Sequence, residues 1–361
     1  MQTYMARPKG ECCSPLVYAS CESLSIATTE TNFRFGGQAA MGRTMTETVP
    51  PPPRPEPLGL TGYLAPEGFL DELLEEIGEP AAVHDRLVLA PGPARPAAWA
   101  QNVWHDPVRI RFGSIGEAAR ALRAIQRNWA LYPVRHHRRA TLIQEKLPHV
   151  SAKPLVFPAP APMAPLGSWM LEDERTLIAA ARCASPFRNG EVAFAEDRET
   201  PPNRAYLKLW EALTLVGRKP GPGDLCLDLG ASPGGWTWVL HELGARVIAV
   251  DKAPLDPAVA ALPRVEERRG SAFALDPRTV GPVDWLCSDV ICYPERLLRL
   301  VREWLESGLA RNFVCTIKFQ GPTDHAATRA FMAIPGSRVM HLHHNKHELT
   351  WVRMDPGPVT P

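Results

Sequence analysis

The sequence predicts an α/β protein: a Rossmann-like domain of seven strands, the last one antiparallel, preceded by a smaller α+β domain. The first observation is a glycine-rich turn, 228–236, which follows an apolar run at 225–227 and opens into a helical pattern. The second is another apolar run, 246–251, whose final acid follows the turn at about the 20-residue spacing of a Rossmann unit. A strand, a glycine turn and a helix followed by such an acid form the nucleotide-binding edge of a doubly wound sheet.

Strands and helices alternate from residue 203 onward, as expected for a parallel sheet covered by helices. The connection 342–347 between the last two strands is too short to cross over the sheet, so the last strand should run antiparallel. This order speaks against a dehydrogenase. The expected strands lie near 224–229, 246–251, 264–268, 283–288, 311–317, 337–342 and 348–354, and the expected helices near 203–216, 235–243, 294–307 and 323–332.

The first half of the chain is less regular. Residues 1–57 lack a sustained apolar period and end in a proline-rich run, so we expect them to be disordered. Residues 58–153 predict a small α+β domain, 154–199 a connecting segment, and 200–356 the Rossmann-like domain. Within the small domain we expect a helix at 66–79, strands at 83–89 and 108–112, and an amphipathic helix that Ser114 caps and that continues to about 131.

Composition sets bounds on the class of protein. The formal net charge of the 361 residues is +1, so overall charge does not indicate a polyanionic partner. The eight cysteines form no CxxC pair, which is typical of free thiols in a reducing compartment. The sequence has neither an apolar run of the ~18 residues that a membrane span needs nor a signal-peptide pattern at its start. We therefore expect a cytoplasmic protein.

The glycine turn indicates the kind of ligand. Gly230, Gly234 and Gly235 lack a Cβ, so a ligand can approach the backbone closely. No Gly-Lys-Ser/Thr follows, which excludes a P-loop. An acid at the first position, Asp228, suits a ligand with a cationic amino group, such as the methionine part of S-adenosylmethionine (SAM), and Asp251 is placed to bind ribose hydroxyls. The alternatives are a plain turn and an aspartate that caps the next helix.

Four charged residues are expected at the same edge of the sheet. Asp289 and Lys318 follow parallel strands, and Glu348 begins the antiparallel last strand, so all three lie where ligands of α/β sheets bind. Lys208 lies in the helix before the first strand. A neutral lysine can remove the proton of a ribose 2′-hydroxyl, and a neighbouring cation favours the neutral amine. We predict Lys318 as the base and Lys208 as its neighbour; the alternative is four solvated surface charges.

These segments resemble the FtsJ-like 2′-O-ribose methyltransferases, a SAM-dependent family with a Rossmann-like domain. The resemblance rests on 203–208, 228–235, 288–289, 317–318 and 347–348. It implies a catalytic tetrad in the order Lys208, Asp289, Lys318 and Glu348. The implied SAM-binding residues are Asp228, Gly230, Ser232, Pro233, Gly234, Gly235, Trp236, Asp251, Ser271 and Asp289.

Within that family the chain is most similar to the RlmM type, which methylates one cytidine of large-subunit ribosomal RNA. The Pro-Gly-Gly-Trp-Thr run at 233–237, the helix at 208–212 and a long N-terminal part with a THUMP-like RNA-binding module carry this resemblance. It is specific over 200–352 and loose over 62–199. Two positions depart from the pattern: Asn203 stands where the family usually has Ser, and Ser271 stands near the adenine site in place of an acid.

A basic stretch, 120–153, carries eight Lys or Arg residues against one acid, with aromatic residues between them. Such a stretch fits phosphate contacts and base stacking, although a solvated helix face is the alternative. The expected RNA contacts are Arg127, Arg135, Arg138, Arg139 and Lys146. Four histidines at 341–347 lack partners at zinc spacing, so we expect no metal and place them in a loop near RNA or the active site.

Together these patterns predict a SAM-dependent RNA 2′-O-methyltransferase that acts on ribosomal RNA, with no membrane and no obligate protein partner. The segment after Asp289 lacks the Asn/Asp-Pro-Pro-Tyr/Phe motif of base methyltransferases. A non-catalytic RNA-binding protein that retains the fold stays open as a second class. A nicotinamide oxidoreductase is disfavoured by the acid before the glycines and by the antiparallel last strand.

Overall fold

The computed structural model describes residues 51–357, so most of the segment expected to be disordered lies outside the described residues. The first part contains β1 (Glu56–Pro57), β2 (Leu60–Leu64), α1 (Leu70–Ile77), β3 (Ala82–His84), β4 (Leu87–Pro91), β5 (Asn102–His105), β6 (Val108–Arg111), α2 (Ile115–Ile125), β7 (Trp129–Leu131), α3 (His137–Gln144), β8 (Gly167–Leu171), β9 (Thr176–Ala180), β10 (Arg182–Cys183) and the 3₁₀ turn η1 (Arg188–Gly190).

The second part contains α4 (Tyr206–Val216), β11 (Leu225–Leu229), α5 (Gly235–Glu242), β12 (Arg246–Asp251), α6 (Pro257–Ala260), β13 (Val265–Arg269), η2 (Ala272–Ala274), α7 (Pro277–Val280), β14 (Val283–Ser288), α8 (Pro294–Ser307), β15 (Ala310–Lys318), α9 (His325–Met332), β16 (Ser337–Met340) and β17 (Glu348–Arg353). No helix within 51–357 is long and apolar enough to span a membrane.

Two five-stranded sheets make up the first part, in the orders β1-β6-β9-β8-β7 and β10-β5-β2-β4-β3. The expected connecting segment 154–199 therefore differs from the structure, because β8, β9 and β10 arise from it and pair with β6, β7 and β5. Every residue of β8 and β9 is buried, so these runs are core strands. The proline-rich run 154–166 before β8 is the reason that the sequence predicts a connecting segment here and not a hairpin.

The basic region also folds differently from the expected long helix. Ser114 caps α2 as predicted, since its side chain accepts a hydrogen bond from the Glu117 amide. The helix ends at Ile125, however, because Gln126 is extended. Trp129 then begins β7, and its indole N–H donates to the carbonyl oxygens that close the helix. The run 83–89 likewise divides into β3 and β4, which turn at Asp85 with a φ of 55°.

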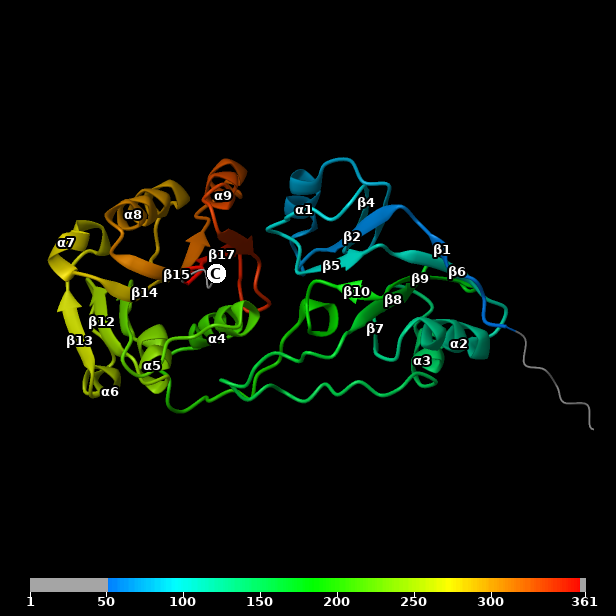
Figure 1. Ribbon diagram of the computed structural model, residues 1–361, viewed down its shortest axis with the longest axis horizontal. Helices are drawn as coiled ribbons and strands as arrows, with labels where there is room; N and C mark the ends of the chain where they lie inside the picture. Colours follow the sequence, from blue (N-terminus) through cyan, green and yellow to red (C-terminus); the bar gives the residue numbers. More distant parts are fainter. Residues whose placement is uncertain (1–50, 358–361) are drawn as a thin grey trace, which may run out of the picture. The chain divides into compact units, whose positions relative to one another are not determined.

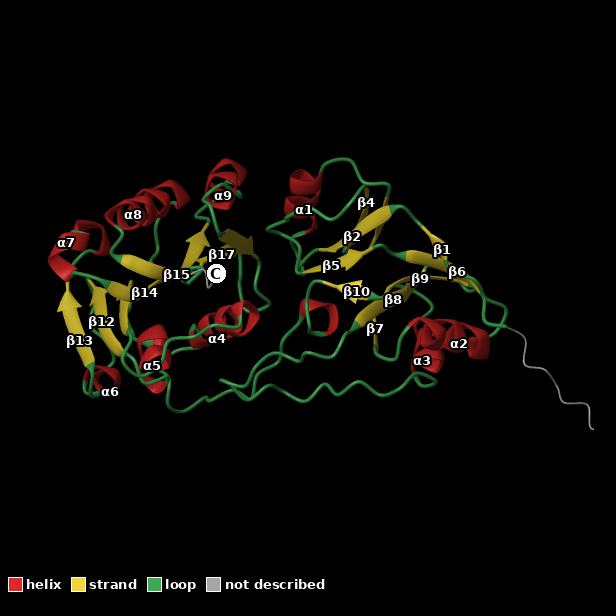
Figure 2. Cartoon of the chain, viewed as in Figure 1, coloured by secondary structure: helices red, strands yellow, loops and turns green. Residues whose placement is uncertain are grey.

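The second part has one seven-stranded sheet in the order β13-β12-β11-β14-β15-β17-β16 (Figures 1 and 2). Strands β11 to β15 pair in parallel, whereas β17 pairs antiparallel with both β15 and β16. The predicted fold class is confirmed, including the antiparallel last strand. Every strand expected in this part is present, and α6 and α7 are short helices that the sequence pattern did not indicate.

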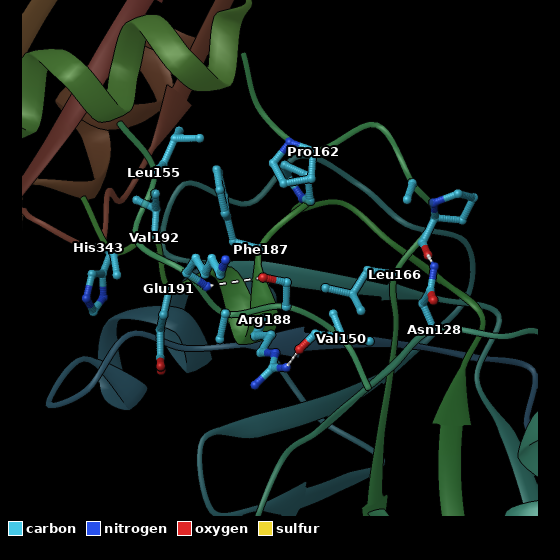
Figure 3. Close-up of a pocket in the computed structure, with 17 residues that line it drawn as sticks. Asn128, Val150, Leu155, Pro162, Leu166, Phe187, Arg188, Glu191, Val192 and His343 are labelled. Carbon is cyan, nitrogen blue, oxygen red and sulfur yellow. Dashed lines mark hydrogen bonds between the residues drawn. The ribbon is translucent and has the colours of Figure 1, made fainter. Parts of the chain in front are cut away.

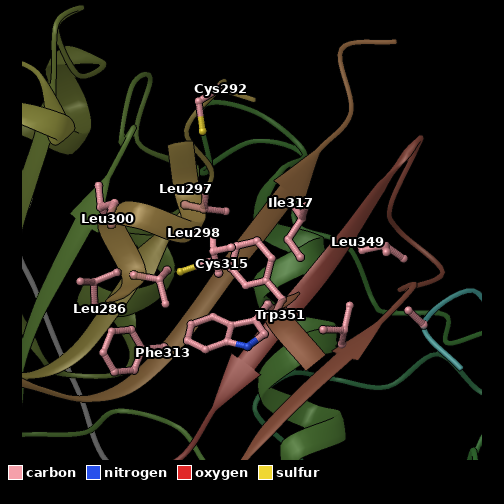
Figure 4. Close-up of a cluster of buried hydrophobic side chains, with 14 of the residues drawn as sticks. Leu286, Cys292, Leu297, Leu298, Leu300, Phe313, Cys315, Ile317, Leu349 and Trp351 are labelled. Atoms are coloured by element: carbon pink, nitrogen blue, oxygen red, sulfur yellow. The ribbon is translucent and has the colours of Figure 1, made fainter. Parts of the chain in front are cut away.

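Helices cover both faces of this sheet, α8 and α9 on one and α4 and α5 on the other (Figure 2). Alternate residues of β15 serve the two faces: Phe313 and Cys315 pack with α8, and Val314 packs with the α4 side. Trp351 of β17 fills the centre of the first face (Figure 4). This packing holds β14, β15 and β17 in register, so the residues at their ends are fixed relative to one another.

Candidate active site

The four residues of the predicted tetrad come together around Asp289. The Lys208 Nζ lies 2.7 Å from Asp289 Oδ1 and 3.2 Å from Glu348 Oε1. The Lys318 Nζ lies 3.2 Å from the same Asp289 oxygen and donates to the Asp289 carbonyl oxygen at 2.5 Å. All four side chains are at most about one-fifth exposed, so these are not solvated surface charges. Two cations and two carboxylates thus share one partly buried site.

The sheet explains this convergence. Asp289 directly follows β14, and Lys318 is the last residue of β15, its parallel neighbour. Glu348 is the first residue of β17 and pairs with Lys318 across the antiparallel ladder. Lys208 comes from α4, which packs against the face of the sheet next to this edge. Carboxyl ends of parallel strands and the start of an antiparallel one therefore meet.

A cavity of about 450 Å³ opens beside the tetrad. This volume lies within the usual range for small-molecule sites, about 300–1,000 Å³. Lys318 and Asp289 contribute to its wall, so the cavity and the tetrad are continuous. Its lining consists of Gly230, Ser232, Val250, Asp251, Lys252, Gly270, Ser271, Ala272, Phe273, Asp289, Val290, Ile291, Arg296 and Lys318.

Asp251 lies at the end of β12 and lines the cavity, as the sequence predicts. Its Oδ2 accepts the Ser232 amide at 3.0 Å, and its Oδ1 accepts the Ala253 amide at 2.9 Å. Each carboxylate oxygen retains a second lone pair for a further donor. These two amides fix the orientation of the carboxylate and leave it able to receive a pair of hydroxyl groups.

Asp228, which the sequence predicts as a ligand residue, has a fully buried side chain that does not line this cavity. Its Oδ2 accepts the Thr237 hydroxyl at 2.7 Å, while Oδ1 has no partner among the described residues. Burial is the main cause that raises the pKa of Asp228 to about 7, against the lowering effect of the Thr237 hydrogen bond. Asp228 instead ties β11 to α5.

The rest of the glycine turn shapes the edge of the site. Gly230 has a φ of 79°, and a Cβ there would lie 2.6 Å from the Val290 backbone, so β11 and the loop after β14 meet only because the residue is glycine. A Cβ on Gly235 would lie 2.3 Å from Asn203 Oδ1. Of the turn residues expected to bind SAM, Gly230 and Ser232 line the cavity, whereas Pro233, Gly234, Gly235 and Trp236 do not.

The cavity has apolar and cationic walls that the sequence pattern did not indicate. Ser271 lines it as predicted, but its hydroxyl accepts the Phe273 amide within a turn. Phe273 itself lines the cavity, and the Arg296 guanidinium lies 3.9 Å from the centre of its ring. Arg296 lies in the first turn of α8, after β14. Its place in the sequence, shortly after Asp289 and in the first turn of the next helix, could have indicated that Arg296 lines the cavity.

The structure divides the residues expected to contact RNA. Arg127, Arg135, Arg138 and Lys146 are exposed. Arg139 is only partly exposed, and its guanidinium lies 5.5 Å from the centre of the Phe112 ring. The aromatic residues Trp129 and Tyr132 are buried, so the expectation that they stack on bases is wrong.

The four histidines of 341–347 have different environments. His341 is buried, and burial lowers its pKa to about 4. His344 and His347 are partly buried, while His343 is exposed and lines a separate cavity of about 360 Å³ (Figure 3). Within residues 51–357, no three His, Cys, Asp or Glu side chains gather as a metal ion requires.

Sequence comparison identifies what this domain is similar to. Residues 201–320 match the FtsJ-like methyltransferase family model. The ribosomal RNA large subunit methyltransferase M of Halorhodospira halophila is 40% identical over 158 residues, which cover 41% of this chain and 46% of that protein. The protein of that name from Alkalilimnicola ehrlichii is 36% identical over 200 residues, 51% of this chain and 55% of its own length.

The chain thus spans about half the length of the curated relatives it matches. Among solved structures, a fibrillarin from Methanococcus jannaschii, a pre-rRNA processing protein, aligns over 52% of this chain and 82% of its own, with 18% identity and a TM-score of 0.35. Residues 201–320 thus match the FtsJ-like methyltransferase model, and they lie in the domain whose seven-stranded sheet has the antiparallel last strand that the sequence predicts.

Proposed function

We propose that this protein transfers a methyl group from SAM to a ribose 2′-hydroxyl of RNA, specifically ribosomal RNA. The observation that carries the proposal is the joining of Lys208, Asp289, Lys318 and Glu348 around one carboxylate oxygen at the edge of the cavity. Three relatives that are 34 to 40% identical to this chain over the aligned residues are named ribosomal RNA large subunit methyltransferase M.

The residues of the 450 Å³ cavity fit SAM. Asp251 offers a carboxylate to the ribose hydroxyls. Val250, Phe273 and Ile291 offer apolar surface to the adenine. Gly230 and Ser232 line the cavity on the side of the glycine-rich turn and offer polar backbone groups to the methionine end. A cofactor that binds here would place its reactive end toward Lys318, because Lys318 and Asp289 are the two tetrad residues that form part of the cavity wall.

Lys318 is the proposed general base. When bound, SAM would supply a methyl group on a positively charged sulfonium. The neutral Lys318 amine would take the proton of the 2′-hydroxyl as that oxygen bonds to the methyl carbon; the carbon–sulfur bond breaks and its electron pair stays on sulfur, which leaves as a neutral thioether. Asp289 orients Lys318 through two contacts, and the proton later leaves to solvent through a side chain that is 19% exposed.

Lys208 and Glu348 complete the charge balance. With both lysines protonated, the two cations and two carboxylates are neutral as a group. Lys208 remains paired with Asp289 and Glu348 while Lys318 gives up its proton, so Asp289 is never left without a cation. This arrangement stabilises the ionised carboxylates that hold the base in place.

RNA is the proposed second substrate. The exposed arginines at 127, 135 and 138 and Lys146 would contact phosphates. The part of the chain that carries them forms two sheets of its own, as an RNA-binding module would. A non-catalytic RNA-binding protein would have no need of a lysine held against Asp289 beside a cofactor-sized cavity.

The decisive experiment is methyl transfer from labelled SAM to RNA by the purified protein, followed by mapping of ribose methylation. We expect labelled 2′-O-methylribose in large-subunit ribosomal RNA. A protein that binds SAM and RNA but transfers no label would support the non-catalytic alternative. Thermal stabilisation by NAD in place of SAM would instead favour a nicotinamide enzyme.

A further inference from the structure

We propose that Glu211 is a positioning residue: it fastens the loop 341–347 to helix α4 and thereby holds Glu348 against Lys208. This inference rests on the proposed function of the tetrad. It adds a residue that does not touch the reacting groups and that lies outside the cavity wall beside Lys318. The evidence is a set of hydrogen bonds, their burial and their place along α4.

Glu211 makes three contacts with two consecutive residues of the loop. Its Oε1 accepts the His343 amide at 2.7 Å, and its Oε2 accepts the His344 amide at 3.0 Å. The His344 Nδ1 lies 2.6 Å from Oε2. Since a carboxylate only accepts, Nδ1 carries a hydrogen here. One side chain thus accepts from two consecutive backbone amides of the loop and orients an imidazole.

These contacts are shielded from water. Glu211 is 2% exposed, and the His344 side chain is 15% exposed. A buried carboxylate is stable only with its hydrogen bonds formed, and removing an acceptor leaves buried donors without partners. Little water reaches these hydrogen bonds to compete with them, and this favours the position in which the loop is bound to α4.

The position of Glu211 links this attachment to the tetrad. Glu211 follows Lys208 by three positions on α4, and residues with that spacing share one face of a helix. Lys208 contacts Glu348, the residue that directly follows the loop, at 3.2 Å. The same face of α4 therefore contacts the loop through Glu211 and its end through Lys208.

Hydrogen bonds within the loop connect its first residues with its last ones, so a displacement of one part of the loop moves the other part. The Asn345 amide donates to the Leu342 carbonyl oxygen at 3.0 Å, and the Glu348 amide donates to that of Lys346 at 2.9 Å. The His341 Nε2 lies 3.0 Å from the Lys346 oxygen. Releasing residues 343 and 344 from α4 would therefore leave the Glu348 side chain without support on the loop side, and its contact with Lys208 would weaken although β17 stays paired with β15.

The test compares Glu211→Gln, His344→Ala and His344→Asn with Thr214→Val. In Glu211→Gln, an amide group replaces one acceptor oxygen and faces donors of the loop. In His344→Asn, the amide nitrogen can take the place of Nδ1. Thr214 is buried on the same helix and donates to the Trp210 carbonyl oxygen, so its substitution perturbs α4 without touching the loop.

We expect Glu211→Gln to lower kcat by about 10- to 100-fold, the effect of leaving buried donors unpaired, with the KM for SAM unchanged. His344→Ala should lower kcat less, His344→Asn should restore it, and Thr214→Val should match the wild type. In a Glu348→Ala background, Glu211→Gln should have no further effect, because the two residues act in one chain of contacts.

Hydrogen exchange of the peptide that spans 341–349 gives a readout without catalysis. Faster exchange of this peptide in Glu211→Gln, with wild-type exchange in β11 and α5, supports the proposal. A wild-type protein that transfers no methyl group would refute the proposed function, but it would not affect this exchange result. Additive effects of Glu211→Gln and Glu348→Ala, or unchanged exchange in the loop, would overturn the proposal about Glu211. Equal loss of kcat in Thr214→Val would show that any damage to α4 suffices.

Discussion

Lys318 contacts Asp289 twice, through the carboxylate oxygen Oδ1 at 3.2 Å and through the main-chain carbonyl oxygen at 2.5 Å. The second contact does not depend on the charge of Asp289. It therefore holds the lysine amine at the end of β14 even where the side-chain pair is weakened. This fixed amine beside the cavity is the basis of the first prediction.

Lys318→Ala should reduce methyl transfer by about 10²- to 10⁴-fold, the usual contribution of a positioned general base. SAM should still bind, because the carboxylate and the apolar wall of the cavity are unchanged. Single-turnover rates with labelled SAM measure the first effect and calorimetry the second. Lys219→Ala, at an exposed lysine whose Nζ donates to the Pro158 carbonyl oxygen, is the control. Near-normal turnover in Lys318→Ala would refute the role of the base.

Asp251→Ala should weaken SAM binding by about 1–3 kcal/mol, the value of charge-assisted hydrogen bonds to a ligand. The folded state should persist, since Asp251 lies at the end of β12 and not in the core. Titration calorimetry measures the change. Glu266→Ala, at an exposed acid of the adjoining β13, is the matched variant and should bind SAM as the wild type does. If both variants bind SAM with the same affinity, Asp251 does not contact the cofactor.

Neutralising Arg127, Arg135 and Arg138 to Gln should weaken RNA binding across unrelated sequences. Arg139 is left intact because it packs on Phe112. Each lost phosphate contact should flatten the slope of log K against log salt by about 0.7–0.9. Arg299 and Arg302, exposed on α8, provide the control pair. A triple variant with wild-type affinity at low salt would show that this surface is only solvated and that RNA is held elsewhere.

Asp228→Asn should change how stability depends on pH. Burial raises the pKa of Asp228 from an ordinary 3.8 to about 7. Between these values the folded state retains a proton that the unfolded state releases, so this group lowers the free energy of unfolding as pH rises from about 4 to 7. Asparagine has no such proton. The free energy of unfolding of the variant, relative to wild type, should therefore rise across that window by a few kcal/mol, at about 1.4 kcal/mol per pKa unit.

Urea unfolding at several pH values between 5 and 8 measures this difference. The Asn amide also places a donor where Oδ1 has no partner among the described residues, which adds a constant offset at every pH. The change with pH, and not the absolute stability, is therefore the test. Thr237→Val, which removes the donor to Oδ2, should raise the pKa of Asp228 further and so extend the dependence to higher pH, because the ionised form loses a hydrogen bond. Parallel curves for wild type and Asp228→Asn would contradict the raised pKa.

Local pattern was sufficient for much of the Rossmann-like half. Strand β12 and helix α8 have the bounds that their apolar periods predict, because each period reports backbone conformation over a short run. The order of these elements then places Asp289, Lys318 and Glu348 at one edge, since parallel strands end there and an antiparallel strand begins there. The tetrad could be predicted because topology, and not side-chain detail, brings it together.

Other features depend on contacts between distant segments. The hairpin β8–β9 is stabilised by pairing with β6 and β7, which no local period reports. Trp129 has helical spacing from Ile125, yet it belongs to β7 because its indole donates to the carbonyl groups that end α2. In these places tertiary packing overrides local propensity.

The sequence by itself predicted the fold class, the antiparallel last strand and the edge of the sheet at which the tetrad and Asp251 lie, all of which follow from periodicity, spacing and the rules of sheet topology. Only the tertiary structure decided that Asp228 is buried and accepts a hydrogen bond from Thr237, and that Glu211 accepts hydrogen bonds from the loop before Glu348. An acid in a sequence can bind a ligand, cap a helix or anchor a loop. The burial and the donors that surround it, which arise from segments far apart in the chain, select among these roles.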